Sequence, residues 1–340
     1  MQAQIRPVIS SSFTPAWWLK HAHLQTIFAK YLSPKLKQKT VAEIFPLADG
    51  DEIQLNWMQP SRIASDAPLV VLLHGLAGDI NSHYIQAMLA QCRHLRWPAV
   101  LMHFRGCNGQ PNKLPRAYHS GDTADFSAVI TEISQRFPEQ KLVAIGYSLG
   151  ANVLLKYCGE QTTANPLATA VAVCPPLDLS ACASRINQGS SRIYQRYLLG
   201  RLKRSTALKL KQFPEFPIPL TLKKLSTLRN IEQFDDSFTA PIHGFSSAQD
   251  YYQKASGKAF LQHISIPTLI IHAKDDPFLS DAVIPTAEEL NHYIHYELSQ
   301  GGGHVGFVCG NIFKPKFWLT QRIPTFIREQ LSNDNSVPAT

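Results

Sequence analysis

The sequence predicts an α/β fold with a mostly parallel central sheet that is covered by helices on both faces. Five short runs are almost continuously apolar, as strands buried on both faces are. They lie at residues 69–73, 99–104, 142–145, 170–174 and 269–271. Segments with helical length and spacing occur between them, at residues 84–95, 122–137 and 150–157. This alternation indicates βαβ units, which build parallel sheets.

A hairpin is expected ahead of these units. Residues 41–47 and 53–58 have strand character and flank the turn sequence Ala-Asp-Gly-Asp at residues 48–51. A glycine-containing turn between two such runs is typical of a β-hairpin. An antiparallel entry into a parallel sheet is common in large α/β proteins.

A long insertion interrupts the strand pattern between the fourth and fifth apolar runs. Ordinary crossover connections are far shorter than this stretch. It contains helical segments at residues 193–202, 207–213 and 220–228, separated by proline-rich turns. We therefore expect an inserted helical cap at residues 175–264. The remaining divisions are an N-terminal segment packing on the core (1–38), the α/β core (39–174 and 265–331) and a polar, frayed tail (332–340).

Composition limits the class of protein. Among the 340 residues, 44% are hydrophobic and 17% charged, which predicts a packed core and argues against disorder. The formal charge of +8 does not by itself indicate nucleic acid, because zinc-finger spacing and RNP-type motifs are lacking. Six scattered cysteines without a CxxC pair favour the cytoplasm. Neither a secretory signal nor a transmembrane helix is expected, and no obligate protein partner is indicated.

The strongest motif is Gly-Tyr-Ser-Leu-Gly at residues 146–150. It follows an apolar strand and precedes a helical run, which is the context of a G-x-S-x-G nucleophile elbow. The sharp turn holds the serine in a strained conformation and exposes its hydroxyl at a helix N-terminus. Ser148 is therefore the candidate nucleophile.

A serine nucleophile needs a base and an acid that orients the base. In this type of site the chain order is Ser, then Asp or Glu, then His. Asp275 and Asp276 follow the last apolar run, and His304 follows three glycines after residues 294–298. His304 is thus the candidate base. Either aspartate fits as the acid, since adjacent side chains point in different directions.

Two backbone amides complete the candidate site. His-Gly-Leu at residues 74–76 ends the first apolar run, and the loop after that strand supplies one N–H of an oxyanion hole. The residue after the nucleophile supplies the other. We expect Leu76 and Leu149 to be these donors, and no metal ligand is indicated.

Together these motifs resemble the YheT-like branch of the α/β-hydrolase superfamily, also called the AB hydrolase-4 family. The resemblance covers roughly residues 10–330. Besides residues 146–150, it rests on the segments Pro-Ala-Trp-Trp (15–18), His-Ala-His-Leu-Gln-Thr (21–26), Leu-His-Gly-Leu (73–76), Phe-Arg-Gly-Cys-Asn-Gly (104–109), Ala-Lys-Asp-Asp-Pro-Phe (273–278) and Gly-His-Val-Gly-Phe (303–307).

The resemblance implies the α/β-hydrolase fold and a carboxylic-ester hydrolase without a cofactor, with relatives acting on medium-chain acyl esters and lipids. The family pattern implies Asp275 as the acid. The general superfamily spacing, with a small residue three positions before the acid, would select Asp276 from Ala273. Two alternatives remain: an acyltransferase with the same triad, and a non-catalytic binding protein on this fold.

The cap carries a basic amphipathic segment at residues 192–211. One interpretation is a solvated helix face. The other is contact with an anionic membrane or steering of an anionic substrate. A cap above the nucleophile favours an apolar acyl chain in a small-molecule ester or lipid substrate. Trp17 and Trp18 have two interpretations as well, either lining the same pocket or belonging to the core.

Overall fold

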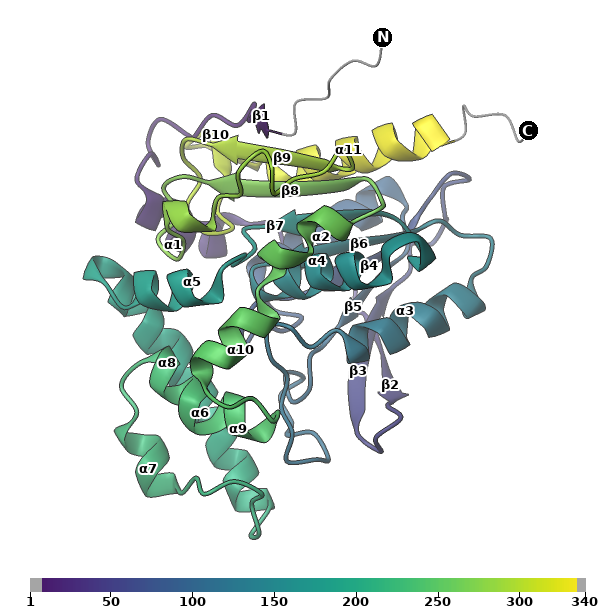
Figure 1. The fold of residues 1–340 in the computed structure, drawn as a ribbon. Coiled ribbons are helices and arrows are strands. Elements are labelled where there is room, and N and C mark those ends of the chain that lie inside the picture. Colours follow the sequence, from purple (N-terminus) through teal and green to yellow (C-terminus); the bar gives the residue numbers. More distant parts are fainter. Residues whose placement is uncertain (1–7, 335–340) are drawn as a thin grey trace.

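A nine-stranded sheet forms the centre of the computed structural model, which describes residues 8–334 (Figure 1). The strand order is β1-β9-β8-β7-β6-β4-β5-β3-β2. The strands are β1 (Val8–Ser10), β2 (Val41–Pro46), β3 (Glu52–Met58), β4 (Leu69–Leu73), β5 (Ala99–Met102), β6 (Leu142–Tyr147), β7 (Leu167–Val173), β8 (Thr268–Ala273) and β9 (Ile294–Ser299).

The pairing matches the predicted architecture. The seven strands β1, β9, β8, β7, β6, β4 and β5 pair in parallel with their neighbours. The antiparallel hairpin β2–β3 joins the sheet through an antiparallel pairing of β3 with β5. Strands β4 to β8 coincide with or overlap the five apolar runs, and they are almost completely buried. The continuous apolar runs thus correspond to strands covered on both faces.

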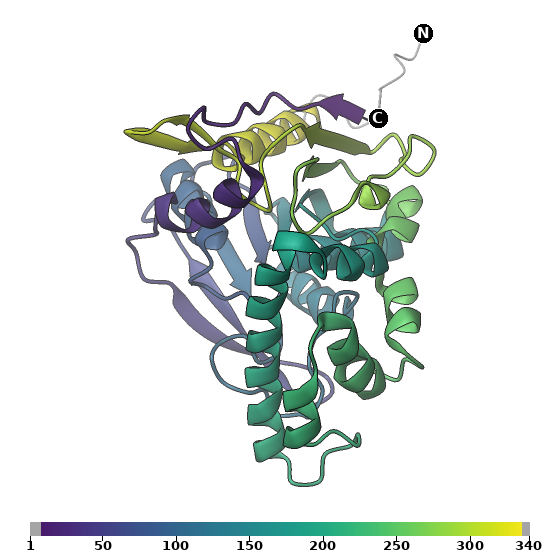
Figure 2. The same cartoon turned by 90° about the vertical axis from the view of Figure 1, so that its left-hand side faces the viewer.

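Five longer helices surround this sheet. They are α1 (Ala22–Leu32), α2 (His83–Leu95), α3 (Ala124–Arg136), α4 (Leu149–Gln161) and α11 (Leu319–Asp334). Helices α2 and α11 lie on one face of the sheet, and α3 and α4 lie on the other (Figure 2). Short 3-10 turns follow α4 (η1, Thr162–Ala164) and β8 (η5, Asp281–Val283). None of the helices within residues 8–334 is long and apolar enough to span a membrane.

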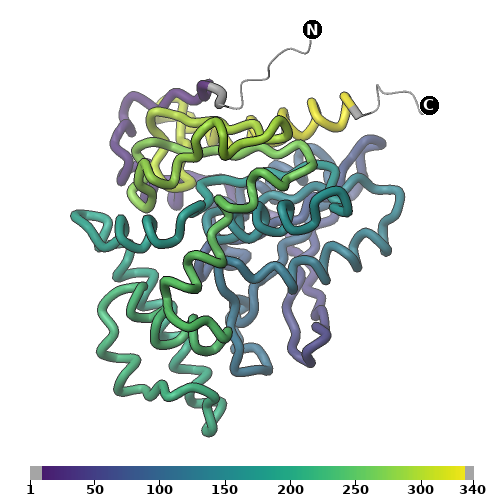
Figure 3. Tube along the Cα trace, in the orientation of Figure 1, coloured from purple at the N-terminus to yellow at the C-terminus, as the bar shows by residue number. Residues whose placement is uncertain are grey.

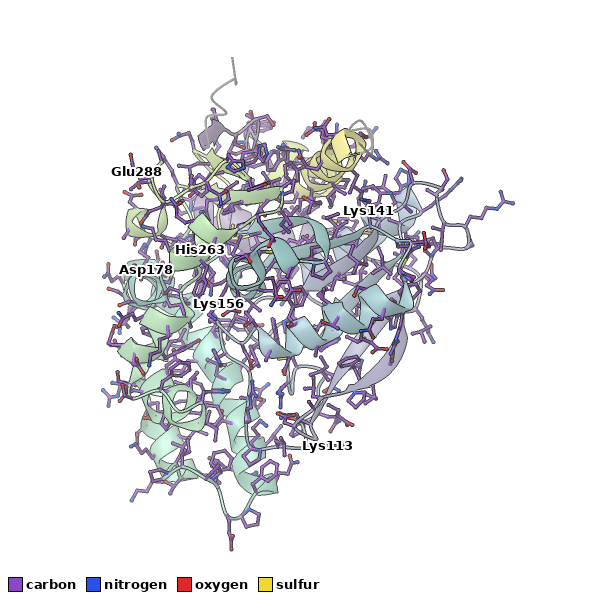
Figure 4. All side chains as sticks on the ribbon, turned by 45° about the vertical axis from the view of Figure 1, so that its right-hand side comes forward. Lys113, Lys141, Lys156, Asp178, His263 and Glu288 are labelled. Atoms are coloured by element: carbon purple, nitrogen blue, oxygen red, sulfur yellow. The ribbon has the colours of Figure 1, made fainter. Side chains whose placement is uncertain are left out.

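The insertion between β7 and β8 consists of helices joined by loops, and it forms a lobe at one end of the sheet (Figure 3). Its helices are α5 (Leu179–Ile186), α6 (Arg192–Gln212), α7 (Leu222–Thr227), α8 (Ile231–Phe234), α9 (Ala240–Ile242) and α10 (Ala248–Ala255). It also contains two 3-10 helices, η2 (Gly189–Ser191) and η4 (Gly257–His263), and one π-helix, η3 (Asp235–Thr239). Asp178, near its start, and His263, near its end, lie on the same side of the molecule (Figure 4).

Helix α6 corrects one prediction. Residues 193–202 and 207–213 were expected to form two helices, but both belong to a single helix of 21 residues. The intervening residues 203–206 contain neither glycine nor proline, so nothing interrupts the hydrogen bonding. The prolines that follow begin at Pro214, beyond the end of the helix.

Three further strands lie in segments for which no strand was predicted. β1 extends the sheet beyond β9, while β10 (Val308–Asn311) and β11 (Lys314–Phe317) form a separate antiparallel hairpin. These strands have only three or four residues, which is too few to show the alternation of apolar and polar residues that predicts a strand. The expected tail at 332–340 begins inside α11, which ends at Asp334, and residues 335–340 lie outside the described part.

Candidate active site

Ser148 lies at the turn between β6 and α4 with a backbone φ of 52° and ψ of −120°. A positive φ is strained for a residue with a side chain. A Cβ added to Gly146 would lie 2.5 Å from the Gly150 carbonyl oxygen, and one added to Gly150 would lie 2.5 Å from the His74 carbonyl oxygen. Both glycines of the motif are therefore required by close backbone packing around the serine.

A hydrogen-bond chain connects the serine to an imidazole and a carboxylate. His304 Nε2 lies 2.9 Å from Ser148 Oγ, and His304 Nδ1 lies 2.7 Å from Asp276 Oδ2. Asp276 is buried, and its other oxygen accepts a hydrogen bond of 2.8 Å from the Phe278 amide. The Phe278 ring stacks on His304 with a centroid separation of 4.0 Å. The imidazole is thus fixed both along its edge and across its face.

The family pattern led us to prefer Asp275 as the acid, and the geometry does not support that choice. Asp275 Oδ1 accepts a hydrogen bond of 2.9 Å from the Gly303 amide, whereas Asp276 bonds the imidazole. The two residues follow the end of β8, and their side chains leave the backbone in different directions. Asp275 therefore contacts the backbone of the glycine loop just before His304, and only its neighbour reaches the ring.

The loop after β4 lies beside the serine, since a Cβ added to Gly75 would be 3.1 Å from the Ser148 Cβ. The flanking amides are engaged: Gly75 N–H donates to the Tyr84 hydroxyl at 2.9 Å, and Ala77 N–H donates to the Tyr118 hydroxyl at 2.8 Å. Within residues 8–334, the amides of Leu76 and Leu149 have no protein acceptor. Both residues line the same cavity as Ser148. They are available to donate to an oxyanion.

His74 holds this loop against β5. Its side chain is fully buried, and burial lowers its pKa to about 3, so the ring is neutral. The Phe104 amide donates to His74 Nε2 at 3.1 Å, while Nδ1 bonds the Gly75 carbonyl at 2.8 Å. His74 therefore acts as a structural link between two loops.

The Arg-Gly-Cys loop also has a structural explanation. Arg105 is buried and donates to three carboxylates, those of Asp49, Asp51 and Asp125, at 2.7–2.8 Å. Burial raises the pKa of the Cys107 thiol to about 12, so it stays protonated. A protonated thiol is a poor nucleophile, so the loop does not offer Cys107 as an alternative to Ser148.

Two residues of α1 also support the site, although sequence reasoning did not single them out. The Thr26 hydroxyl accepts a hydrogen bond of 2.9 Å from the His304 amide. Gln25 is fully buried, donates to the carbonyls of Leu19 and Val308, and accepts from the Val308 amide. Helix α1 therefore fixes the loop that carries His304. Both residues belong to the segment 21–26, but contacts across about 280 positions leave no local sequence signal.

Ser148 and His304 border a cavity of about 630 Å³ between the core and the insertion. Many of the lining residues from the insertion are apolar, among them Leu179, Ile186, Leu198, Phe234 and Phe238. Neither Trp17 nor Trp18 lines it. Trp17 is 70% exposed, so it belongs to neither pocket nor core, whereas Trp18 packs beside a small buried cluster.

The residues that could ligate a metal within residues 8–334 are Cys174, Asp276 and His304. Asp276 and His304 already bond each other. Burial raises the pKa of the Cys174 thiol well above its ordinary value, which opposes the thiolate that a metal prefers. This group fits the hydrogen-bond chain better than it fits a metal centre.

Comparison with known proteins agrees with this fold. The family model described as the alpha/beta hydrolase fold matches residues 68–309, and the chain belongs to this family. It is 40% identical over 322 residues to "Putative esterase YheT" of Escherichia coli K12, covering 95% of this chain and 94% of that protein. It is 28% identical over 338 residues to human "Phospholipase ABHD3", covering 97% and 82%.

Among solved structures, a Pyrococcus furiosus esterase superimposes with a TM-score of 0.55 at 15% identity. The superposition covers 88% of this chain and 97% of the other. At this identity the likeness concerns the fold.

Proposed function

We propose that the protein is a carboxylic ester hydrolase with Ser148 as nucleophile, His304 as base and Asp276 as the orienting acid. The observation that carries the proposal is the His304 ring, which bonds Ser148 and Asp276 at the wall of a cavity. Membership of the α/β-hydrolase family and similarity to proteins named esterase and phospholipase support it.

The first half of the reaction forms an acyl-enzyme. His304 Nε2 takes the proton of Ser148 as the serine oxygen attacks the ester carbonyl. The amides of Leu76 and Leu149 donate to the oxyanion of the tetrahedral intermediate. His304 then gives its proton to the alkoxide leaving group, and the C–O bond of the ester breaks. Asp276 keeps Nδ1 protonated and stabilises the imidazolium.

The second half returns the enzyme to its starting state. Water replaces the alcohol, and His304 removes one of its protons as the water oxygen attacks the acyl carbon. The collapse of the second tetrahedral intermediate releases the carboxylic acid, and Ser148 recovers its proton from His304. No cofactor takes part in these steps.

The substrate we propose is an ester with a short or medium acyl chain. The apolar side chains that the insertion contributes to the cavity favour a hydrocarbon chain rather than a polar group. A cytoplasmic location is part of the proposal, and it is supported by six free cysteines.

The experiment is an acyl-chain series of p-nitrophenyl esters, from acetate to laurate, with wild-type protein and two serine variants. Ser148→Ala is expected to lower kcat by about 10³-fold or more. Ser134→Ala, at a half-buried serine on α3 that does not line the cavity, is the matched control and should retain wild-type activity. Wild-type activity in Ser148→Ala would overturn the proposal, and the chain-length optimum reports the depth of the cavity.

The same assay separates hydrolysis from acyl transfer. Adding a short alcohol to the reaction offers a second acceptor for the acyl-enzyme. A hydrolase forms mainly free acid, whereas an acyltransferase forms mainly the new ester. If the new ester is the main product at a low alcohol concentration, the protein is an acyltransferase and not a hydrolase.

A further inference from the structure

Helix α1 presents an apolar stripe to solvent. Leu24, Ile27, Phe28 and Tyr31 lie at positions i, i+3, i+4 and i+7, which share one helix face. All four are exposed, and Tyr31 is 72% exposed. The other face of the helix carries the buried Gln25 and Ala29, and so the stripe is not needed for the packing of α1 on the core.

The β10–β11 hairpin extends this apolar surface. Ile312 and Phe313 lie at its tip, and Phe313 is 91% exposed. Helix α1 and the hairpin pack together through a buried cluster that includes Ala29, Val308 and Phe317, and Figure 2 shows them at the same end of the molecule. We call the exposed apolar residues of both elements, together with Trp17 in the segment before α1, the α1–hairpin surface: Trp17, Leu24, Ile27, Phe28, Tyr31, Ile312 and Phe313.

The two segments that form the α1–hairpin surface carry basic but no acidic side chains. Residues 10–42 and 298–328, which include both elements, contain no aspartate or glutamate. Seven exposed lysines lie in these segments: Lys20, Lys30, Lys35, Lys37, Lys39, Lys314 and Lys316. Apolar side chains among lysines are the combination that binds an anionic lipid surface. The apolar side chains enter the region between headgroups and acyl chains, and the lysines attract the anionic headgroups.

The surface is continuous with the cavity. Ile27, Lys30 and Tyr31 belong to α1 and line the cavity that contains Ser148. The neighbouring Thr26 accepts the hydrogen bond from the His304 amide. A lipid beside α1 therefore lies at an entrance to the cavity.

We propose that the α1–hairpin surface docks on an anionic lipid bilayer, with α1 between the membrane and the cavity. The docking claim goes beyond the proposed function, because it needs no catalytic step. It also differs from the expectation for residues 192–211. In that segment Lys209 is buried and donates to the Leu114 and Arg116 carbonyls, so it is unavailable to a membrane.

The test is co-sedimentation with vesicles of phosphatidylglycerol and phosphatidylcholine, compared with vesicles of phosphatidylcholine alone. The variants are Leu24→Glu/Phe28→Glu on α1 and Phe313→Glu on the hairpin. None of these residues lines the cavity. Leu222→Glu, an exposed leucine on α7 at the opposite end of the molecule, is the matched control (Figure 1). Arg196→Glu/Arg204→Glu tests the exposed face of α6.

We expect wild type and Leu222→Glu to bind the anionic vesicles and to bind pure phosphatidylcholine at least tenfold more weakly. Both surface variants should lose at least tenfold in affinity while keeping wild-type activity on a soluble p-nitrophenyl ester. Ser148→Ala should bind like wild type, which separates docking from catalysis. If the double variant loses its fold, as judged by circular dichroism, Phe313→Glu decides alone.

Three results would overturn the docking proposal. The first is failure of wild type to bind anionic vesicles. The second is unchanged binding in both surface variants, or a loss confined to Arg196→Glu/Arg204→Glu. The third is a dimer in solution that the surface variants abolish while vesicle binding is absent, which would assign the surface to a second copy of the chain.

Discussion

Asp275 and Asp276 leave β8 one after the other, and their carboxylates face different partners. Asp276 bonds His304 Nδ1, while Asp275 bonds the Gly303 amide. Two adjacent aspartates after one strand look alike in sequence, and the family pattern favoured the other one. Their directions depend on how the loops after β8 and β9 meet, which is a tertiary property that a local motif does not contain.

The Asp276→Asn variant tests this assignment. The amide no longer stabilises the imidazolium and favours the wrong tautomer of His304, so we expect kcat to fall by about 10⁴-fold. Asp275→Asn should cost much less, about tenfold, because it changes only a contact to the loop backbone. Steady-state kinetics on a soluble p-nitrophenyl ester measure both. A larger loss in Asp275→Asn than in Asp276→Asn would return the role to Asp275.

Two tyrosine hydroxyls bond the backbone of the loop after β4 that carries the Leu76 amide. Tyr118→Phe removes the acceptor of the Ala77 amide next to Leu76 and loosens the loop. We expect kcat to drop about tenfold with KM nearly unchanged, less than the 10²–10³ lost with an oxyanion donor itself. Tyr84→Phe, which frees the Gly75 amide, should behave similarly. Wild-type kcat in both variants would show that the loop needs neither hydroxyl.

At the scale of elements, α1 ties the N-terminal segment to the loop of His304. Gln25→Ala would leave the Val308 amide and the Leu19 carbonyl without their hydrogen-bond partner, whereas the Val308 carbonyl would keep its hydrogen bond from the Ala16 amide. We expect a loss of about 2–4 kcal/mol in the free energy of unfolding and a lower kcat. Urea unfolding and the esterase assay measure the two effects. Gln38→Ala, with one exposed hydrogen bond, is the control and should change neither.

The π-helical turn η3 places a carboxylate in the wall of the cavity. Burial raises the pKa of Asp235 to about 6, although Thr239 and Tyr252 donate to it. The folded state therefore binds more protons than the unfolded state between about pH 4 and pH 6. The resulting stability is present below pH 4 and is lost as the pH rises through 6.

Asp235→Asn should remove this pH dependence. At pH 7 we expect the variant to unfold with up to about 3 kcal/mol more free energy than wild type, from roughly two pKa units at 1.4 kcal/mol each. At pH 4 the difference should vanish. Urea unfolding at both pH values measures it, and an equal difference at pH 4 and pH 7 would contradict the assignment to Asp235.

The elements differ in how readily the sequence predicts them. Strands β4 to β8 are buried on both faces, so each appears as a continuous apolar run. β1 has three residues and exists because β9 offers a free edge, which no local pattern records. Helix α6 was predicted as two helices with a turn between them, but residues 203–206 contain no proline and the hydrogen bonding continues through them.

At the scale of the whole molecule, the formal charge of +8 is unevenly distributed. The acid-free segments 10–42 and 298–328 are distant in sequence but pack together through Gln25 and Val308. The net charge alone is compatible with several kinds of binding partner. The fold favours an anionic lipid surface among them, because it brings lysines and exposed apolar side chains together beside the cavity entrance.

The whole-molecule view also shows which site residues the sequence could supply. Ser148 and its glycines form a local motif, and the chain order of Ser, Asp and His follows from the fold. Thr26 of α1, Tyr84 of α2 and Tyr118 of the loop between β5 and α3 support the site, and only the folded chain brings them there.

If Ser148 is an activated nucleophile, it reacts with a fluorophosphonate, so covalent labelling followed by peptide mass spectrometry tests its role without a substrate. A fluorophosphonate loses fluoride to an activated serine and leaves a stable phosphonyl ester. We expect one adduct per chain, located on Ser148, with Ser148→Ala unlabelled and His304→Ala labelled far more slowly. An adduct on another residue, or wild-type labelling of Ser148→Ala, would contradict that role.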